Sequence, residues 1–218
     1  MNKKQVQQRV LQNGNPLPLD KFEWDEKTNT FSSNEDNLVL DFQGIDYCTF
    51  KTGSDCTFDT GFDCTFDTGS YCTFDTGSGC TFDTGFYCTF DTGCDCIFDT
   101  GSDCTFKTGS GCIFKTGSDC TFKTGSDCTF DTGSDCTFKT GFYCTFDTGS
   151  DCTFDTEEEC VIVRRDIYEV IEIPANTKIK LNEYRVKGYQ IIDDTPIGKK
   201  VKIKVADGQI LEGEIVED

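Results

Sequence analysis

Between residues 48 and 160 the apolar residues recur with a period of eight. Cys stands at every eighth position from Cys48 to Cys160, and Phe stands two residues after each Cys from Phe50 to Phe154. The repeating unit, here called the octad, is Cys-Thr-Phe-Asp/Lys-Thr-Gly-Ser-Asp, so apolar and polar residues alternate along its first half. This alternation predicts a short strand with Cys and Phe on its buried face. Because one octad cannot bury its own apolar face, the pattern predicts stacked units, a β-solenoid.

Each octad is expected to place one Cys and one Phe in the interior and to turn at its Thr-Gly dipeptide. Phe supplies most of the apolar surface and Cys is a small filler, so rows of each kind would run along the solenoid axis. The Gly is expected to form the corner, because Gly adopts positive φ without strain. The representative core positions are Cys56, Phe58, Cys104, Phe106, Cys112, Phe114, Cys120 and Phe122.

The irregular positions of the repeat favour a parallel β-helix with two octads in each coil. Three kinds of substitution recur at a spacing of two octads: Ile97 with Ile113, Tyr71 with Tyr87, and Lys107 with Lys123 and Lys139. The lysines also argue the other way, because stacked like charges repel. A three-sided coil of three octads would separate them and stays an alternative. An antiparallel meander is disfavoured, because it would leave the Cys and Phe face uncovered.

The segments around the repeat predict a cap at each end. Residues 1–37 are expected to form an N-terminal cap, residues 38–173 the solenoid, and residues 174–218 a small C-terminal β-domain or cap. A short helix is predicted from Asn2 to Gln12. A β-hairpin is predicted from Lys21–Trp24 and Thr30–Ser32, and the alternation from Leu38 to Phe42 predicts the first solenoid strand.

The C-terminal region is rich in Val, Ile and Lys and is expected to be all strand. The segment from Lys199 to Val205 alternates, and it returns from Ile210 to Val216 after a turn at Asp207-Gly208, which predicts a hairpin with Lys opposite Glu. The frame of the octads is expected to continue through Tyr168-Glu169-Val170. Shorter strands are predicted at Val161–Val163, Tyr168–Ile173, Lys178–Leu181 and Tyr189–Ile192.

The charge of the chain belongs mostly to the repeat and narrows the classes of partner. The 218 residues carry a formal net charge of −19 and include no His. Residues 48–156 hold 17 Asp and 5 Lys, which gives 5 − 17 = −12 of that charge. An acidic surface repels nucleic acid and anionic membranes, so neither is expected as a direct partner. Without His, the usual acid–base chemistry and mixed Cys/His zinc sites lose a component.

The 16 cysteines are expected to be reduced core residues. They are locked to the repeat period, as core positions are, whereas disulfide frameworks tie loops at irregular spacings. The segment from Met1 to Lys4 opens a polar stretch without the apolar run of a signal peptide, and no apolar run is long enough to span a bilayer. A cytoplasmic or virion location, in a reducing environment, is therefore expected.

Three kinds of chemistry are conceivable for the repeat. The Asp residues on either side of the Gly turn are similar to oxygen ligands of calcium, but Lys replaces the first and Tyr or Gly the second in several octads. The rows of Cys could hold soft metals only as thiolates, and burial among Phe raises thiol pKa values. An ordered Thr column could bind ice, yet its outward neighbour here is a strongly hydrated Asp or Lys. No catalytic residue, cofactor, metal or small-molecule ligand is expected.

A few residues depart from the octad in ways that concern binding. Cys94 replaces a turn Ser, so it is expected to be an exposed, fast-reacting thiol. Trp24 is expected to cover the open end of the core, with display for a partner as the alternative. Aromatic side chains in the turns could form apolar contact spots. The candidate partner contacts are Trp24, Phe62, Phe86, Tyr87, Phe142 and Tyr143.

The chain resembles a group of largely uncharacterised octapeptide-repeat proteins of phages, large DNA viruses and some bacteria. The resemblance rests on the Cys-Thr-Phe-Asp/Lys-Thr-Gly octads, on the segment Lys21–Asp25 that precedes them and on the segment Cys160–Asp166 that follows them. It implies a β-solenoid and a viral setting, and it implies no activity and no site residues.

These observations predict a non-enzymatic, acidic β-solenoid rod that acts as a structural or protein-interaction module, such as a virion or assembly component. Its partner, another protein or a further copy of the chain, would be held through the caps or the solenoid ends. The alternative is a DNA mimic in the manner of acidic pentapeptide-repeat proteins that bind topoisomerases. An ice-binding or calcium-binding surface is the third reading, and an enzyme is the least expected.

Overall fold

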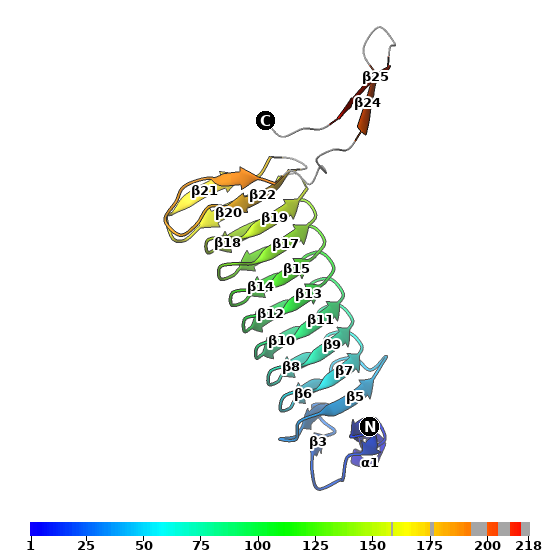
Figure 1. The fold of residues 1–218 in the computed structure, drawn as a ribbon. Helices are drawn as coiled ribbons and strands as arrows, with labels where there is room; N and C mark the ends of the chain where they lie inside the picture. The colour runs from blue at the N-terminus through cyan, green and yellow to red at the C-terminus, as the bar shows by residue number, and fades with distance from the viewer. Residues whose placement is uncertain (158, 175–176, 193–199, 205–209, 215–218) are drawn as a thin grey trace.

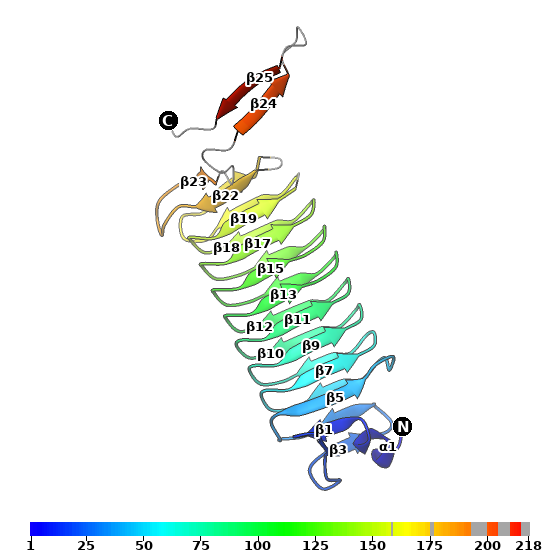
Figure 2. The ribbon, with the colours of Figure 1, turned by 45° about the vertical axis from the view of Figure 1, so that its right-hand side comes forward.

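The computed structural model describes residues 1–157, 159–174, 177–192, 200–204 and 210–214. Two parallel β-sheets face each other and the chain passes from one to the other at every octad, so that the coils stack into a straight rod (Figures 1 and 2). Sheet A has the order β2-β1-β5-β7-β9-β11-β13-β15-β17-β19-β22-β23, and sheet B the order β21-β20-β18-β16-β14-β12-β10-β8-β6-β4-β3. A third, separate sheet pairs β24 with β25.

The solenoid strands follow the octads. In sheet A they are β5 (Leu38–Phe42), β7 (Thr57–Thr60), β9 (Thr73–Thr76), β11 (Thr89–Thr92), β13 (Thr105–Lys107), β15 (Thr121–Lys123), β17 (Thr137–Thr140) and β19 (Thr153–Thr156). In sheet B they are β4 (Thr30–Ser32), β6 (Thr49–Lys51), β8 (Thr65–Asp67), β10 (Thr81–Thr84), β12 (Ile97–Thr100), β14 (Ile113–Lys115), β16 (Thr129–Asp131), β18 (Thr145–Thr148) and β20 (Val161–Arg164).

The coil contains two octads. Parallel neighbours pair Phe90 with Phe106 in sheet A and Phe98 with Phe114 in sheet B, so residues two octads apart lie side by side. The two-octad prediction is confirmed, and the three-sided coil and the antiparallel meander are wrong. The lysines that argued against this coil do stack, with Lys123 registered against both of its repeat neighbours.

The interior is a zipper of Phe rings with Cys beside it. Phe114 stacks on the rings of Phe98 and Phe130 at centroid distances of 4.8 Å with interplanar angles of 3°. It meets Phe106 and Phe122 from the opposite sheet edge-on, at 5.3 Å. Both arrangements are favourable for aromatic pairs, and they repeat along the rod. All the representative core positions are at most 1 % exposed: Cys56, Phe58, Cys104, Phe106, Cys112, Phe114, Cys120 and Phe122.

The turns differ from the expectation in one respect. The residue with positive φ is the last of the octad, for example Asp103 at 58° and Gly111 at 72°, and not the Gly of Thr-Gly. That Gly is required for space, because a Cβ on Gly117 would overlap Oγ of Ser102 in the preceding coil. The same Ser102 Oγ accepts a hydrogen bond from the backbone N–H of Ser118 at 3.0 Å. A ladder of Ser hydroxyls thus joins the turns of successive coils.

The N-terminal end is closed by antiparallel strands and one short helix, α1 (Lys3–Gln7). The helix ends earlier than predicted, because the next residues form β1 (Val10–Gln12), which pairs antiparallel with β5 and buries Val10. The predicted hairpin is confirmed, since β3 (Glu23–Asp25) pairs antiparallel with β4. The remaining strand of this cap is β2 (Asn15–Pro16), at the outer edge of sheet A.

Two boundary predictions require correction. The solenoid begins before residue 38, because β4 is already parallel to β6, with Phe31 registered against Phe50. The parallel coils end at Arg164, because β21 (Glu169–Glu172) turns back antiparallel onto β20. Tyr168, which the frame assigns to a Cys position, is 91 % exposed in that turn.

Arg164 fixes the C-terminal end. Its guanidinium is fully buried and makes a two-pronged ion pair with Asp166, with Nε–Oδ1 and Nη2–Oδ2 distances of 3.1 and 2.8 Å. It also donates to the backbone carbonyl oxygens of Glu183 and Val186, so the buried charge is compensated and ties the following loop to the coil. In sheet A, β22 (Lys178–Leu181) pairs antiparallel with β19, and β23 (Tyr189–Ile191) with β22.

The C-terminal hairpin is confirmed where it is described. Strands β24 (Lys200–Lys204) and β25 (Ile210–Glu214) pair antiparallel, and the register places Lys200 opposite Glu214 and Lys202 opposite Glu212. The predicted turn at Asp207-Gly208 lies outside the described residues.

The Phe zipper yields a direct test of the core. Phe114→Ala removes a ring held by four aromatic neighbours, and the rigid coils above and below resist collapse into the space. The free energy of unfolding should fall by about 3–5 kcal/mol. Urea denaturation followed by circular dichroism measures the change, and a loss under about 1 kcal/mol would mean that this ring is not part of a tight core.

Candidate functional site

The rod exposes two flat sheet faces and two turn edges, and the candidate residues divide among them. The first edge consists of the turns that come directly after the strands of sheet A in the chain, and the second edge consists of the turns that come directly after the strands of sheet B. On both edges the octad supplies a half-buried Ser, whose hydroxyl bonds to the next coil, and an Asp that is exposed in most coils. Aromatic side chains replace them at a few coils, and these positions distinguish one part of the edge from another. The exposed turn aromatics are Tyr47, Phe62, Phe142 and Tyr143 on the first edge, and Tyr71, Phe86 and Tyr87 on the second.

The most compact group lies on the second edge and is here called the aromatic cluster: Tyr71, Phe86 and Tyr87. The rings of Tyr71 and Tyr87 stack at 5.0 Å with an interplanar angle of 7°. The ring of Phe86 lies over Gly101 of the next coil, where a Cβ would come within 2.6 Å of its Cδ1. All three remain at least half exposed. The cluster is therefore held rigidly and still presents apolar surface.

The other predicted contacts are placed differently. Phe142 and Tyr143 lie on the opposite edge near the C-terminal cap, with ring centroids 6.3 Å apart. Phe62 lies on that edge over Gly77, and its carbonyl oxygen accepts a hydrogen bond from the backbone N–H of the exposed Tyr47 at 3.0 Å. Trp24 is only 8 % exposed, and its Nε1 donates to the backbone carbonyl oxygen of Met1 at 2.6 Å. It covers the end of the core, so it is not a displayed contact residue.

On the outer face of sheet A, each solenoid strand places one charged side chain next to its Phe, and these side chains form a column along the rod. Charges of the same sign are grouped into blocks within this column. Aspartates occupy the first four strands of the column, lysines the next three and an aspartate the last. Ion pairs form where the blocks meet, between Lys107 and Asp91 and between Lys139 and Asp155, the latter with an Nζ–Oδ2 distance of 2.9 Å. From β5 to β19 the column reads Asp41, Asp59, Asp75, Asp91, Lys107, Lys123, Lys139 and Asp155.

Sequence reasoning noted the stacked lysines but missed the blocks. The signal was present, because the aspartates recur at the same two-octad spacing. It became readable only when the coil length was known, since a coil of three octads would scatter the same residues over three faces.

The face of sheet B is different. Lys51 pairs with Asp67 and Lys115 with Asp99, at Nζ–Oδ2 distances of 3.8 and 3.0 Å. Arg165, from the C-terminal turn, pairs with both Asp131 and Asp147, at 2.6 and 2.9 Å. The exposed Ile97 and Ile113 are adjacent in register on this face. Much of the charge of sheet B is therefore balanced within the chain.

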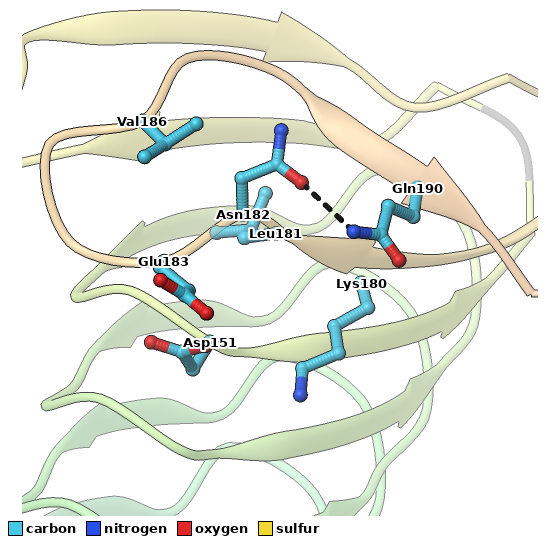
Figure 3. A pocket seen from close by; sticks show the side chains of 7 residues that line it. All are labelled: Asp151, Lys180, Leu181, Asn182, Glu183, Val186 and Gln190. Atoms are coloured by element: carbon cyan, nitrogen blue, oxygen red, sulfur yellow. Dashed lines mark hydrogen bonds between the residues drawn. The ribbon is translucent and has the colours of Figure 1, made fainter.

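A polar cleft of about 280 Å³ lies beside the C-terminal cap (Figure 3). Gln190 Nε2 donates to Asn182 Oδ1 at 3.4 Å, and the side chains of Asp151 and Glu183 also line the cleft. This volume lies just below the usual range for ligand sites, and most of the lining side chains are polar or charged, so the cleft offers a ligand few apolar contacts. Its lining residues are Asp151, Lys180, Leu181, Asn182, Glu183, Val186 and Gln190.

The thiols form two internal rows. All 16 cysteines are free, and each row member points between backbone carbonyls, as Cys104 does toward the oxygens of Ser102 at 3.4 Å and Gly85 at 3.7 Å. Contact with the thiols of Cys120 and Cys88, together with burial, raises the pKa of Cys104. The sulfur of Cys120, which accepts from the thiols of Cys104 and Cys136, has a lowered pKa. Ionisation of one thiol therefore holds its neighbours protonated.

Within the described part of the chain, no group of three or more His, Cys, Asp and Glu side chains has the arrangement of a metal site. No helix in the same residues is long and apolar enough to cross a bilayer.

Cys94 should react alone. It is exposed, while the other 15 cysteines are buried. A disulfide reagent at neutral pH should modify one thiol per folded chain quickly and the rest only after denaturation, and Cys94→Ser should remove the fast phase. Fast modification of several thiols in the native protein would contradict the buried rows.

The thiol rows should make the fold sensitive to alkali. Contacts with neighbouring thiols, together with burial, raise the pKa values of Cys72, Cys104 and Cys136 above that of a free thiol. The contribution of these protonated thiols to the free energy of unfolding is complete below the pKa of a thiol in the unfolded chain, about 8.5. As pH rises above that value, each thiol lowers the free energy of unfolding by about 1.4 kcal/mol per pH unit. Urea unfolding at about pH 8, 9 and 10 measures the slope. The triple Ala variant at these positions should show a smaller slope, and an unchanged slope would contradict this origin.

Comparison of the chain with protein-family models, with curated proteins and with solved structures gave no match.

Proposed function

We propose that the protein is a non-enzymatic rod that binds another protein through aromatic side chains in its turns. The observation that carries this proposal is the aromatic cluster of Tyr71, Phe86 and Tyr87. Aromatic side chains that are rigid and half exposed are the groups that dominate the binding energy of protein interfaces.

The backbone beneath the cluster supports a preorganised contact. The N–H of Phe86 donates to Ser70 Oγ at 3.0 Å, and the N–H of Tyr71 donates to the carbonyl oxygen of Phe86 at 2.9 Å. The turns are therefore cross-linked between coils, and binding would order few additional torsions. A rigid site loses less entropy on association than a mobile loop does.

The surroundings of the cluster indicate the chemistry of the partner. Along the same edge, the coils on either side carry Asp55 and Asp103, both exposed. A matching surface would offer an apolar pocket with Lys or Arg at its rim. The viral or phage setting that the octad resemblance implies makes an assembly component the kind of partner we favour.

The turn edge is preferred over the solenoid ends as the contact surface. The outermost parallel strands are paired with the antiparallel strands β1, β3, β21 and β22, so the parallel coils cannot continue directly from one copy into the next, and the sheet edges at the ends belong to the short antiparallel strands β2, β3, β21 and β23. The DNA-mimic alternative is weakened by sheet A, where a block of three lysines interrupts the row of carboxylates. Inhibition of a type II topoisomerase by the purified chain would revive that alternative.

The aromatic cluster can be removed without touching the core. Replacing Tyr71, Phe86 and Tyr87 by the octad residues Asp, Ser and Asp should leave the melting temperature nearly unchanged, because all three side chains are exposed. In affinity capture from extract of the organism that encodes the chain, the wild type should enrich a protein that this variant does not. The matched control, Phe142→Ser with Tyr143→Asp, should capture it as the wild type does. Equal capture by the wild type and the cluster variant would refute the proposal.

A further inference from the structure

The column of charges on sheet A contains a block of stacked aspartates and a block of stacked lysines, whereas the stacked charges of sheet B are all aspartates. Asp75 lies in register between Asp59 and Asp91, and Lys123 lies in register between Lys107 and Lys139. Adjacent strands of such a sheet are about 4.8 Å apart, so the charges in each block repel one another. The pKa of Asp59 is raised by burial and by the negative charges of Asp75 and Asp41, as expected when like charges repel.

The ion pairs of the chain leave the centre of each block uncompensated. Lys107 and Lys139, at the ends of the lysine block, pair with Asp91 and Asp155. Within the residues that the structure describes, neither Lys123 nor Asp75 has an ion pair. Both side chains are exposed on the flat face. The block arrangement is therefore unfavourable in the isolated chain and calls for a complementary surface.

The geometry points to a second copy of this chain as that surface, and we propose that two copies pack face to face through sheet A with their axes antiparallel. The two-fold axis lies parallel to the strands, between β11 and β13. It places Asp91 opposite Lys107 of the other copy, Asp75 opposite Lys123 and Asp59 opposite Lys139. Because a two-fold interface uses each contact twice, three kinds of pair give six ion pairs. The uncompensated centres of the two blocks face each other.

The shape of sheet A allows this contact from β7 to β17, whereas at the outermost strands β5 and β19 the same axis places Asp41 opposite Asp155. The stacked rings of Phe90 and Phe106, under adjacent strands of the sheet, differ by only 1° in plane, so successive coils hardly rotate. Most sheets twist by about 20° per strand, which limits face-to-face contact to a small patch. Here two flat faces can stay in register from β7 to β17. The column of outward Thr side chains beside the charges would face the equivalent Thr column of the second copy.

Sheet B does not offer the same match, which limits the assembly to a dimer. An equivalent axis between β12 and β14 would pair Asp99 with Lys115, but it would place Asp83 opposite Asp131 and Asp67 opposite Asp147. Asp131 and Asp147 are also already paired with Arg165. Complementarity is therefore confined to one face.

The size of the face predicts a weak dimer. The six strands from β7 to β17, spaced about 4.8 Å apart and about 13 Å wide, cover roughly 370 Å² on each copy, against about 800 Å² in a standard stable interface. The chain also carries a net charge of −19, which opposes association at low salt. At about 0.15 M salt distant charges are screened while close pairs persist, and at about 1 M the pairs are screened as well. Dimerisation should therefore be strongest at intermediate salt.

Sedimentation equilibrium under reducing conditions tests the proposal, with the protein at up to about 0.5 mM, which detects even a Kd near 1 mM. The wild type should dimerise at about 0.15 M salt and dissociate at about 1 M. Asp75→Lys should be monomeric, because the introduced ammonium group would face Lys123, although this change lowers the net charge to −19 + 2 = −17. If net charge alone governed association, this less negative variant would dimerise more strongly than the wild type. Lys123→Asp should also be monomeric.

The double variant Asp75→Lys with Lys123→Asp is the decisive control. It keeps the net charge of −19 and restores opposite charges across the axis, so it should dimerise as the wild type does. Lys115→Asp, the matched change on sheet B, should leave the dimer unaffected. Circular dichroism confirms that each variant folds. A monomeric wild type, a dimeric Asp75→Lys variant or a monomeric double variant would each overturn the proposal. The aromatic cluster lies on a turn edge, so this inference stands or falls independently of the proposed function.

Discussion

The rest of the structure depends on the stacking of identical Phe rings at a spacing of two octads. Rings in the same sheet lie parallel at 4.8 Å, as between Phe98 and Phe114, and rings from opposite sheets meet edge-on. The centroid distance equals the spacing of hydrogen-bonded strands, so backbone pairing and aromatic stacking are satisfied by the same repeat. One residue type in one register therefore sets the coil length, the flatness of the sheets and the straightness of the rod.

The turns enforce that register. A Gly in each turn lies too close to the preceding coil to carry a Cβ, and the last residue of the octad adopts positive φ, which explains why Asp or Gly usually occupies it. The exceptions are informative. Tyr71, Tyr87 and Tyr143 accept a left-handed backbone that is unfavourable for a bulky residue, and all three are exposed. Side chains placed there at a cost in conformational energy, with no role in the core, support a role for these turns in binding.

The sequence alone predicted the interior well and the boundaries less well. Alternation within the octad identified Cys and Phe as core, and substitutions two octads apart identified the coil. The first coil was missed because Phe31 precedes Phe50 by more than two octads, so the frame does not reveal it. The end of the solenoid was missed because it depends on Arg164 and Asp166, a tertiary ion pair with no periodic signal. The charge blocks of sheet A required knowledge of which octads share a face.

Deletion of whole octads tests the central claim, a coil of two octads, most directly. Removing Cys120–Asp135 takes out one complete coil and should leave a shorter rod that unfolds cooperatively with only a modest loss of stability. Removing Cys120–Asp127 takes out a single octad, so every later strand moves from sheet A to sheet B or from sheet B to sheet A. Strand β20 and the C-terminal cap then no longer match the coil beneath them, and the free energy of unfolding should fall steeply. Removing three octads should be as damaging as removing one. The account would be contradicted if the two-octad deletion unfolded the protein while the three-octad deletion was tolerated.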